Sequence, residues 1–444
     1  MNTSNGQQAE PEFAAYVGLD WSDKKHAWSL EPAGSGKTER GEFGSDPQKV
    51  EEWVETLNRR FAGKPIAVGL EHTRGPLLWM LSVHSNLWLY LIHPKAATNL
   101  RSALYPSGTK NDPVDADVIR MAVEKFRQHW QVWKPDTADI EQLRSLVRRR
   151  RKLVDEKTQQ TNRLSGELKV CFPQVLEWFD SLGTDVVADF LRRWPTLSHV
   201  QKARRQTLLD FFHKHNSHSA KRNAERLDAI GVSKAVTEDA AVLEPAQIEV
   251  RARLNIISAL RDAIQELDED IESRYKSHPD AVIFASFPAA GPVMGPRLMA
   301  AFGSCRERFQ SAAQVQSLSG IAPVGRSSGS SGTVRKRKAC PKFLRQTFHE
   351  YATHTIGRCA WATEFYELQK QRGNRHHAAV RSLAYKWIRI LYHCWANRVP
   401  YDDSIHAARR TQAAIASDNH GRAASVGILW ETCGGMNKAT KISY

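Results

Sequence analysis

Three things are scarce in this 444-residue sequence: cysteine, long apolar runs, and acidic charge relative to basic charge. The six cysteines are scattered and form no CxxC pair, so neither a zinc site nor a disulfide framework is predicted. No apolar run is long enough to span a bilayer, and the N-terminal residues MNTSNGQQAEPEF show no signal-peptide pattern. These absences weigh against a membrane or disulfide-stapled protein and favour a reducing, cytoplasmic setting.

What the sequence does contain is an excess of positive charge. Lys and Arg outnumber Asp and Glu by 63 to 48, which gives a formal net charge of +15 and a sequence pI of about 9.6. Such a balance favours a polyanionic partner, and the lack of a membrane span favours nucleic acid over an anionic membrane. The length and the 41% hydrophobic content are sufficient for two or three domains with real cores.

The N-terminal third alternates strand-like and helix-like segments. Short apolar runs predict strands at 16–20, 26–30, 66–71 and 88–92, with another near 41–43, and helical periodicity appears at 50–61 and after Leu77. This order predicts an α/β domain with a mixed sheet over residues 13–135, preceded by a disordered segment at 1–12.

Acidic residues end two of these predicted strands. Asp20 and Glu71 would lie side by side if their strands are neighbours, and a carboxylate at a buried strand end is costly unless it is paired or binds a metal. Asp112 and Asp115 have i, i+3 spacing, so they share one face of a predicted helix, with Asp112 as its cap before Pro113. For any one of these acids, a purely structural role without a metal is the better explanation. For the ordered set of four we predict a Mg²⁺ site.

The segment PVGRSSGSSGTVRKRK, residues 323–338, combines four serines, three glycines and a basic run. It predicts a loop that brings backbone N–H groups and a hydroxyl close to a phosphate. On its own this composition is more typical of a plain solvated loop. The candidate phosphate-neutralising side chains are Arg326, Arg335, Lys336, Arg337 and Lys338.

The middle of the chain, residues 136–280, carries two apolar stripes. The stripes predict two coiled-coil helices that pair within one chain or between chains, one from Leu143 to Leu168 and one from Val250 to Ile271. A helical insert of unassigned role lies between them, at about 174–245. The first stripe also carries a basic run that is either a solvated face or a nucleic-acid contact, namely Arg148, Arg149, Arg150, Arg151 and Lys152.

Residues 281–415 predict a helical C-terminal domain, and residues 416–444 predict a flexible tail. The segment from Phe284 to Gly303 resembles a helix-hairpin-helix whose turn, PAAG at 288–291, could present backbone N–H groups to a DNA phosphate. A plain corner between two helices explains so short a pattern equally well.

Together these motifs resemble a known family. They are similar to the motifs of the RuvC-like domain of the DEDD insertion-sequence transposases, namely VGLD, GLEHTRG, His93-Pro94 and KNDPVDA. Members of that family are bridge-RNA-guided recombinases with an additional serine in a C-terminal domain. The resemblance covers about residues 15–172 and 247–405. The family usually has EATG, KTDxxDA and PGIG where this chain has EHTRG, KNDPVDA and PAAG.

The resemblance implies a RuvC/RNase H-like fold for the first domain, followed by a coiled coil and a mainly α-helical C-terminal domain. It implies that Asp20, Glu71, Asp112 and Asp115 bind Mg²⁺. Asp117 lies outside the family pattern and is expected at the surface.

The same resemblance implies that Ser328, directly before Gly329, is the nucleophile, with Ser327, Ser330 and Ser331 as neighbouring alternatives. The implied partners are donor DNA, target DNA, a structured bridge RNA and further copies of the chain, in a dimer or tetramer that associates with the nucleoid when active. No histidine lies in the loop to act as a base, so we expect the acids, of the same or another subunit, to activate the serine.

Without the resemblance, the residues predict only a basic, metal-dependent nucleic-acid enzyme. One alternative is a structure-selective nuclease that uses the acids and water without a serine. Another is a non-catalytic RNA- or DNA-binding protein whose acids are structural. A trapped phosphoserine adduct would exclude the nuclease, and loss of Mg²⁺ dependence would favour the binding protein.

Overall fold

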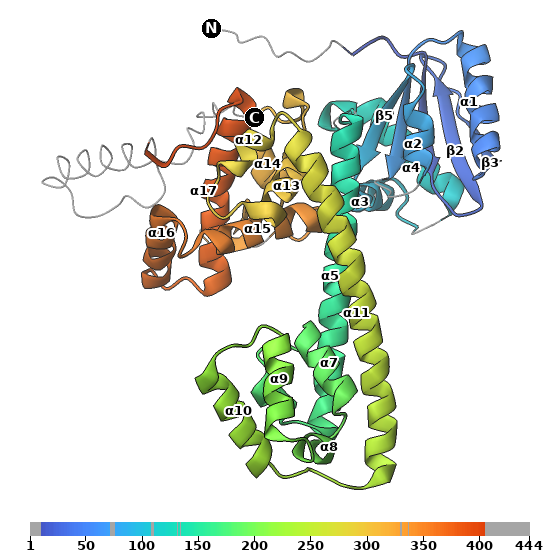
Figure 1. Ribbon diagram of the computed structural model, residues 1–444. Helices are drawn as coiled ribbons and strands as arrows, with labels where there is room; N and C mark the ends of the chain where they lie inside the picture. The colour runs from blue at the N-terminus through green and yellow to red at the C-terminus, as the bar shows by residue number, and fades with distance from the viewer. Residues whose placement is uncertain are drawn as a thin grey trace, which may run out of the picture. The chain divides into compact units, whose positions relative to one another are not determined.

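The computed structural model describes residues 10–71, 76–107, 111–130, 132–133, 135–328, 331–335 and 337–404 (Figure 1). The chain divides into two compact units, residues 1–138 and 139–444. Among the described residues, none of the helices is both long and apolar enough to cross a membrane.

The first unit is built on one five-stranded sheet of order β3-β2-β1-β4-β5. Strands β1, β4 and β5 run parallel, whereas β2 and β3 are antiparallel to their neighbours, so the predicted mixed α/β domain is confirmed. The strands are β1 (Ala15–Asp20), β2 (Lys25–Pro32), β3 (Glu39–Gly44), β4 (Ile66–Glu71) and β5 (Leu87–Ile92).

Helices cover both faces of this sheet. They are α1 (Pro47–Phe61), α2 (Leu77–Ser82), α3 (Pro94–Leu104), α4 (Asp112–Phe126) and the 3₁₀ turn η1 (Arg127–His129). Along β4, Val68 and Leu70 join a core with helices α1 and α2, whereas Ala67 joins a second core with α4. This alternation follows from the two-residue period of a strand, and it makes β4 buried on both faces.

Residues 1–9 and 405–444 lie outside the described residues, so the predicted disordered segment can be judged only at its end and the predicted tail, 416–444, cannot be judged. Glu10 accepts hydrogen bonds from the Tyr90 hydroxyl and from Arg127 Nε, both at 3.0 Å. Two partners distant in sequence thus hold the Glu10 carboxylate, and disorder of the segment 1–12 stays a prediction.

The second unit contains two long helices, α5 (Ala138–Cys171) and α11 (Ala240–Ser277), which lie side by side and antiparallel (Figure 1). Arg150 of α5 pairs with Asp268 of α11, and Arg253 of α11 donates to Gln160 of α5 at 2.9 Å. The apolar positions near each end of the pair are buried in two separate cores. Pairing within the chain is found, whereas coiled-coil packing and pairing between chains stay predictions.

One core belongs to the predicted helical insert. Its helices are α6 (Val175–Trp178), α7 (Asp185–Arg193), α8 (Leu197–Gln201), α9 (Arg205–Lys214) and α10 (Ala220–Val232). Phe190 and Phe212 are fully buried here against Leu164 of α5 and Leu254 of α11. Pro245, where the insert was predicted to end, lies inside α11 as its sixth residue, where it removes one backbone hydrogen bond of the helix.

The other core belongs to the C-terminal helices. The elements are α12 (Ala281–Ala285), α13 (Gly291–Phe302), η2 (Arg306–Arg308), α14 (Ala312–Leu318), β6 (Val324–Ser328), β7 (Ser331–Arg335), α15 (Lys342–Thr355), α16 (Ala360–Gln371) and α17 (His376–Asn397). Trp387 and Trp395 of α17 are fully buried, and their indole N–H groups donate to Thr355 Oγ1 and to the Gly303 carbonyl. Both buried indole N–H groups are thus paired, which helps to fix the position of α17.

Candidate active site

Asp20 and Glu71 end neighbouring parallel strands. The register of β1 and β4 pairs Gly18 with Gly69 and Leu19 with Leu70, so the next residue on each strand is an acid. Parallel strands lie about 4.8 Å apart, and their carboxyl ends meet at one edge of the sheet. The side-by-side arrangement expected from the sequence is therefore found.

The paired glycines explain how α4 approaches these strand ends. A Cβ atom on Gly18 would lie 2.1 Å from the Ala116 carbonyl oxygen and 2.3 Å from the Arg120 backbone nitrogen. A Cβ on Gly69 would lie 2.6 Å from Val123 Cγ2. Only glycine lets the helix backbone lie directly on β1. This role was not predicted from the sequence, although a glycine stands two residues before each strand-end acid.

The N-terminus of α4 supplies the other two acids. Asp112 is the first residue of the helix, and the cap is Asn111, whose Oδ1 accepts from the Val114 N–H at 2.9 Å. The predicted cap is therefore wrong by one residue. The consequence favours the site, because a carboxylate that does not cap the helix is available to the pocket in front of it.

All four predicted acids line one pocket of about 270 Å³, together with Ala97, Thr98, Arg101, Val118 and Ile119. Asp115 forms an ion pair with Arg101 of α3, and both side chains are less than one-fifth exposed. Arg101 was not singled out from the sequence, because nothing in its local pattern connects α3 to Asp115.

The four carboxylates of the pocket are a candidate site for a divalent metal. Four carboxylates give an all-oxygen site, which is the chemistry that Mg²⁺ prefers. As they stand, the described residues include no group of three or more His, Cys, Asp or Glu side chains that could hold an ion. The residues thus fit Mg²⁺ in kind and in location, and one of the four carboxylates, that of Asp115, is paired with Arg101.

Asp117 lies on a different face of α4, and its predicted surface position is wrong. Its side chain is 4% exposed, accepts from Ser29 Oγ at 2.5 Å and forms an ion pair with Arg40 at 2.6 Å. Arg120, one turn further along α4, donates to the same Ser29 hydroxyl and pairs with Glu31. Asp117 therefore belongs to a polar network that ties α4 to β2, outside the acid pocket.

The serine–glycine segment is a two-stranded antiparallel hairpin rather than the predicted loop. Strand β6 pairs with β7 in a register that places Ser328 opposite Ser331 and Ser327 opposite Gly332. Ser328 is thus the last residue of β6, directly before the connection between the strands. Ser330 lies outside the described residues. The hairpin forms because valine and threonine favour strands, as at Val324, Thr333 and Val334. Pairing of the two strands also gives their backbone N–H and C=O groups hydrogen-bond partners.

The predicted basic residues fall into several environments. On α5, Arg150 and Arg151 are half-buried in ion pairs with acids of the same unit, whereas Arg148, Arg149 and Lys152 are exposed. Near the hairpin, Arg335 and Lys338 are exposed and Arg337 is half-buried. Arg326 lies on β6, and Lys336 lies outside the described residues.

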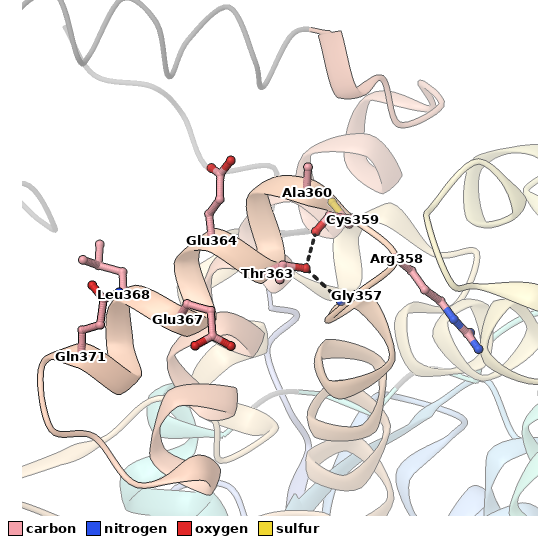
Figure 2. A pocket seen from close by; sticks show the side chains of 9 residues that line it. All are labelled: Gly357, Arg358, Cys359, Ala360, Thr363, Glu364, Glu367, Leu368 and Gln371. Atoms are coloured by element: carbon pink, nitrogen blue, oxygen red, sulfur yellow. Dashed lines mark hydrogen bonds between the residues drawn. The ribbon is translucent and has the colours of Figure 1, made fainter.

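A larger hollow of about 870 Å³ runs along α16 and is lined by none of the predicted site residues (Figure 2). Its floor is tied by Thr363, whose hydroxyl donates to the Cys359 carbonyl and accepts from the Gly357 N–H. Burial raises the pKa of the Cys359 thiol, so this thiol is a weak nucleophile at neutral pH.

Comparison with known proteins gives two family matches, one in the N-terminal part of the chain and one in the C-terminal part. Residues 17–173 match the model of the DEDD-type IS110 transposases, described as "Transposase", and residues 281–367 match the model described as "Transposase IS116/IS110/IS902 family". The chain belongs to the IS110/IS116 transposase family. The first match contains all four acids, and the second contains Ser328.

Two curated relatives extend this similarity over most of the chain. The mini-circle putative transposase for IS117 of Streptomyces coelicolor is 25% identical over 415 residues, which cover 91% of this chain and 99% of the relative. The uncharacterized 44.8 kDa protein of insertion element IS116 from Streptomyces clavuligerus is 25% identical over 386 residues, or 85% and 93%. As an insertion-sequence transposase, the protein acts on DNA.

Proposed function

We propose that this transposase is an RNA-guided DNA recombinase that cuts and rejoins DNA strands through a phosphoserine at Ser328, assisted by Mg²⁺ at Asp20, Glu71, Asp112 and Asp115. The observation that carries the proposal is that these four acids, from two strands and one helix, line one pocket in a member of this family. We further propose a RuvC-like identity for the first unit, which its mixed sheet and paired strand-end acids support.

In the proposed reaction, the Ser328 hydroxyl oxygen attacks a DNA phosphorus and forms a new phosphoester bond. The serine hydroxyl gives up its proton, the bond from phosphorus to the DNA leaving oxygen breaks, and that oxygen takes up one proton as a free DNA hydroxyl, so the step is balanced. The phosphoester energy is kept in the protein–DNA link, so a DNA hydroxyl can reverse the step and rejoin strands without ATP.

The acid pocket supplies the electrostatics of this reaction. A bound Mg²⁺ would polarise phosphate oxygens and lower the pKa of a coordinated hydroxyl. Asp20 and Glu71 hold their oxygens at the sheet edge, and Asp112 and Asp115 face them from the first turn of α4. Arg335, Arg337 and Lys338, with Arg326 and Lys336, are proposed to neutralise the phosphates that approach the hairpin.

Guide-RNA binding is proposed for the exposed cations of α5, Arg148, Arg149 and Lys152. Arg150 and Arg151 are proposed to contribute less to RNA binding, because acids of the same unit already neutralise them. The formal net charge of +15 supports a polyanionic partner such as RNA.

A dimer or tetramer is proposed because α11 exposes large apolar side chains, including Ile248 at 61% and Ile256 at 41%. Such side chains are covered when two copies associate. Light scattering of the protein with its co-purified RNA tests this point. A monomer both with and without RNA would contradict it.

The test of the proposed function uses purified protein with the RNA that co-purifies with it and labelled DNA duplexes spanning the ends of its insertion sequence. We expect SDS-resistant protein–DNA adducts that need Mg²⁺. Ser328→Ala should form no adduct yet keep RNA binding, with Ser327→Ala as the matched control that retains adducts. Cut DNA without any adduct would favour the nuclease, and adducts formed equally well in EDTA would remove the metal from the proposal.

A further inference from the structure

The acid pocket contains its own counter-ion. Among the described residues that line it, Arg101 is the only cation, and it faces the four carboxylates of Asp20, Glu71, Asp112 and Asp115. Arg101 comes from α3, on the same helical face as Ala97 and Thr98, which also line the pocket. Its guanidinium therefore offsets a concentration of negative charge that no other described wall residue offsets.

The ion pair between Arg101 and Asp115 is largely buried, so the charge of Arg101 acts strongly on the pocket. The Arg101 side chain is 19% exposed and that of Asp115 is 17% exposed, so water screens the pair only in part. By contrast, Arg60 and Glu39 of the same unit form a bidentate pair in which both side chains are more than 40% exposed. The two pairs share their chemistry but differ in burial and in location.

The Arg101 guanidinium and a divalent ion are both positively charged, so each disfavours the other beside the Asp115 carboxylate. Arg101 Nη1 donates to Asp115 Oδ1, and the described side chains form no group of three acids able to hold an ion. We propose that Arg101 is a positioning residue that holds Asp115 when no divalent metal is bound and competes with that metal for the carboxylate. This inference rests on the proposed metal role of the pocket.

The proposal predicts that removing the charge of Arg101 strengthens metal binding. Mn²⁺ is the probe, because free and bound Mn²⁺ are counted directly by electron paramagnetic resonance on the full-length chain. One unit charge at contact distance in a partly screened site changes an affinity by about tenfold, so Arg101→Gln should bind Mn²⁺ roughly tenfold more tightly. Arg101→Met, which keeps the aliphatic stem against the pocket wall, should do the same if the glutamine variant folds poorly.

Three comparisons separate charge from structure. Arg101→Lys keeps the charge and should bind Mn²⁺ within about twofold of the unmodified chain. Arg60→Gln, the matched control, should not change the affinity. In an Asp115→Asn background, Arg101→Gln should gain much less, since the carboxylate for which the two cations compete is gone.

Two results would overturn the inference, and a third bears on the proposed function instead. If Arg101→Gln and Arg101→Met bind Mn²⁺ with unchanged affinity, Arg101 does not compete with the metal. If both bind it more weakly, Arg101 orients Asp115 for the metal. If the unmodified chain shows no saturable Mn²⁺ binding that Asp20→Asn removes, the metal part of the proposed function fails, whatever Arg101 does.

Discussion

Gly18→Ala is the substitution that this structure makes most informative. The added methyl group would stand 2.1 Å from the Ala116 carbonyl oxygen and 2.3 Å from the Arg120 backbone nitrogen. Both atoms belong to the backbone of α4, which cannot rotate away as a side chain can. The helix must move outward by about 1 Å before ordinary contact distances return.

This displacement has two separate consequences. Forcing a methyl group into a packed contact costs about 1–3 kcal/mol, which should lower the melting temperature of the first unit by roughly 5 °C. Asp112 and Asp115 lie on the same helix, and a 1 Å misplacement of such groups can lower a reaction rate by about 100-fold. We therefore expect adduct formation to fall much more than the folded fraction at the assay temperature.

Two further glycines calibrate the experiment. Gly69→Ala meets Val123 Cγ2 at 2.6 Å, Ile119 Cγ2 at 2.8 Å and the Ile119 carbonyl oxygen at 3.1 Å, all farther away than the two backbone atoms that Gly18→Ala meets, so its effect should be smaller in both assays. Gly166→Ala, in α5, has no atom within 4 Å of the added Cβ and should raise stability by about 0.5–1 kcal/mol without changing activity. Calorimetry and adduct assays on the four proteins test the order. Unmodified stability and activity in Gly18→Ala would refute the close packing of α4 on β1.

Other substitutions test further parts of the structure. Asp117→Ala should cost about 2–4 kcal/mol in urea unfolding, because it leaves buried partners of the Ser29 network unpaired. Glu71→Gln should raise the metal-free stability by about 1 kcal/mol through reduced repulsion, while it weakens Mn²⁺ binding. Leu254→Ala should cost about 2–5 kcal/mol, since this fully buried side chain joins α11 to the insert. Burial, followed by nearby positive groups, lowers the pKa of His349 below its ordinary 6.5, so the folded state binds fewer protons than the unfolded state. Its contribution to stability is therefore present above pH 6.5 and is lost on acidification, and His349→Gln should flatten the fall in melting temperature between pH 7 and pH 5.

The features that could be predicted from the sequence are those set by local pattern. The strand at 66–71 was predicted at the bounds of β4, because an apolar run buried on both faces ends at a charged residue. The gathering of Asp20, Glu71, Asp112 and Asp115 in one pocket was also predicted, since strand ends and an i, i+3 pair restrict where carboxylates can lie.

The features that could not be predicted depend on contacts between distant segments. Asp117 is buried because Ser29 and Arg40, some 80 residues earlier, meet it across the packing of α4 on β2. Arg101 joins the pocket only because α3 packs beside α4. The hairpin around Ser328 was missed because glycine and serine lower the strand propensity of a segment that pairs with itself.

The central claim is that Ser328 forms a covalent link to DNA. The most direct measurement is mass spectrometry of the SDS-resistant adduct, formed by the RNA-bound protein on labelled insertion-sequence ends and digested to a nucleotide-bearing peptide. We predict a phosphodiester on Ser328, absent from Ser328→Ala and retained by Ser327→Ala. A nucleotide on Ser327, Ser330 or Ser331 would assign the nucleophile to another residue, and recombination without any adduct would contradict the serine mechanism itself.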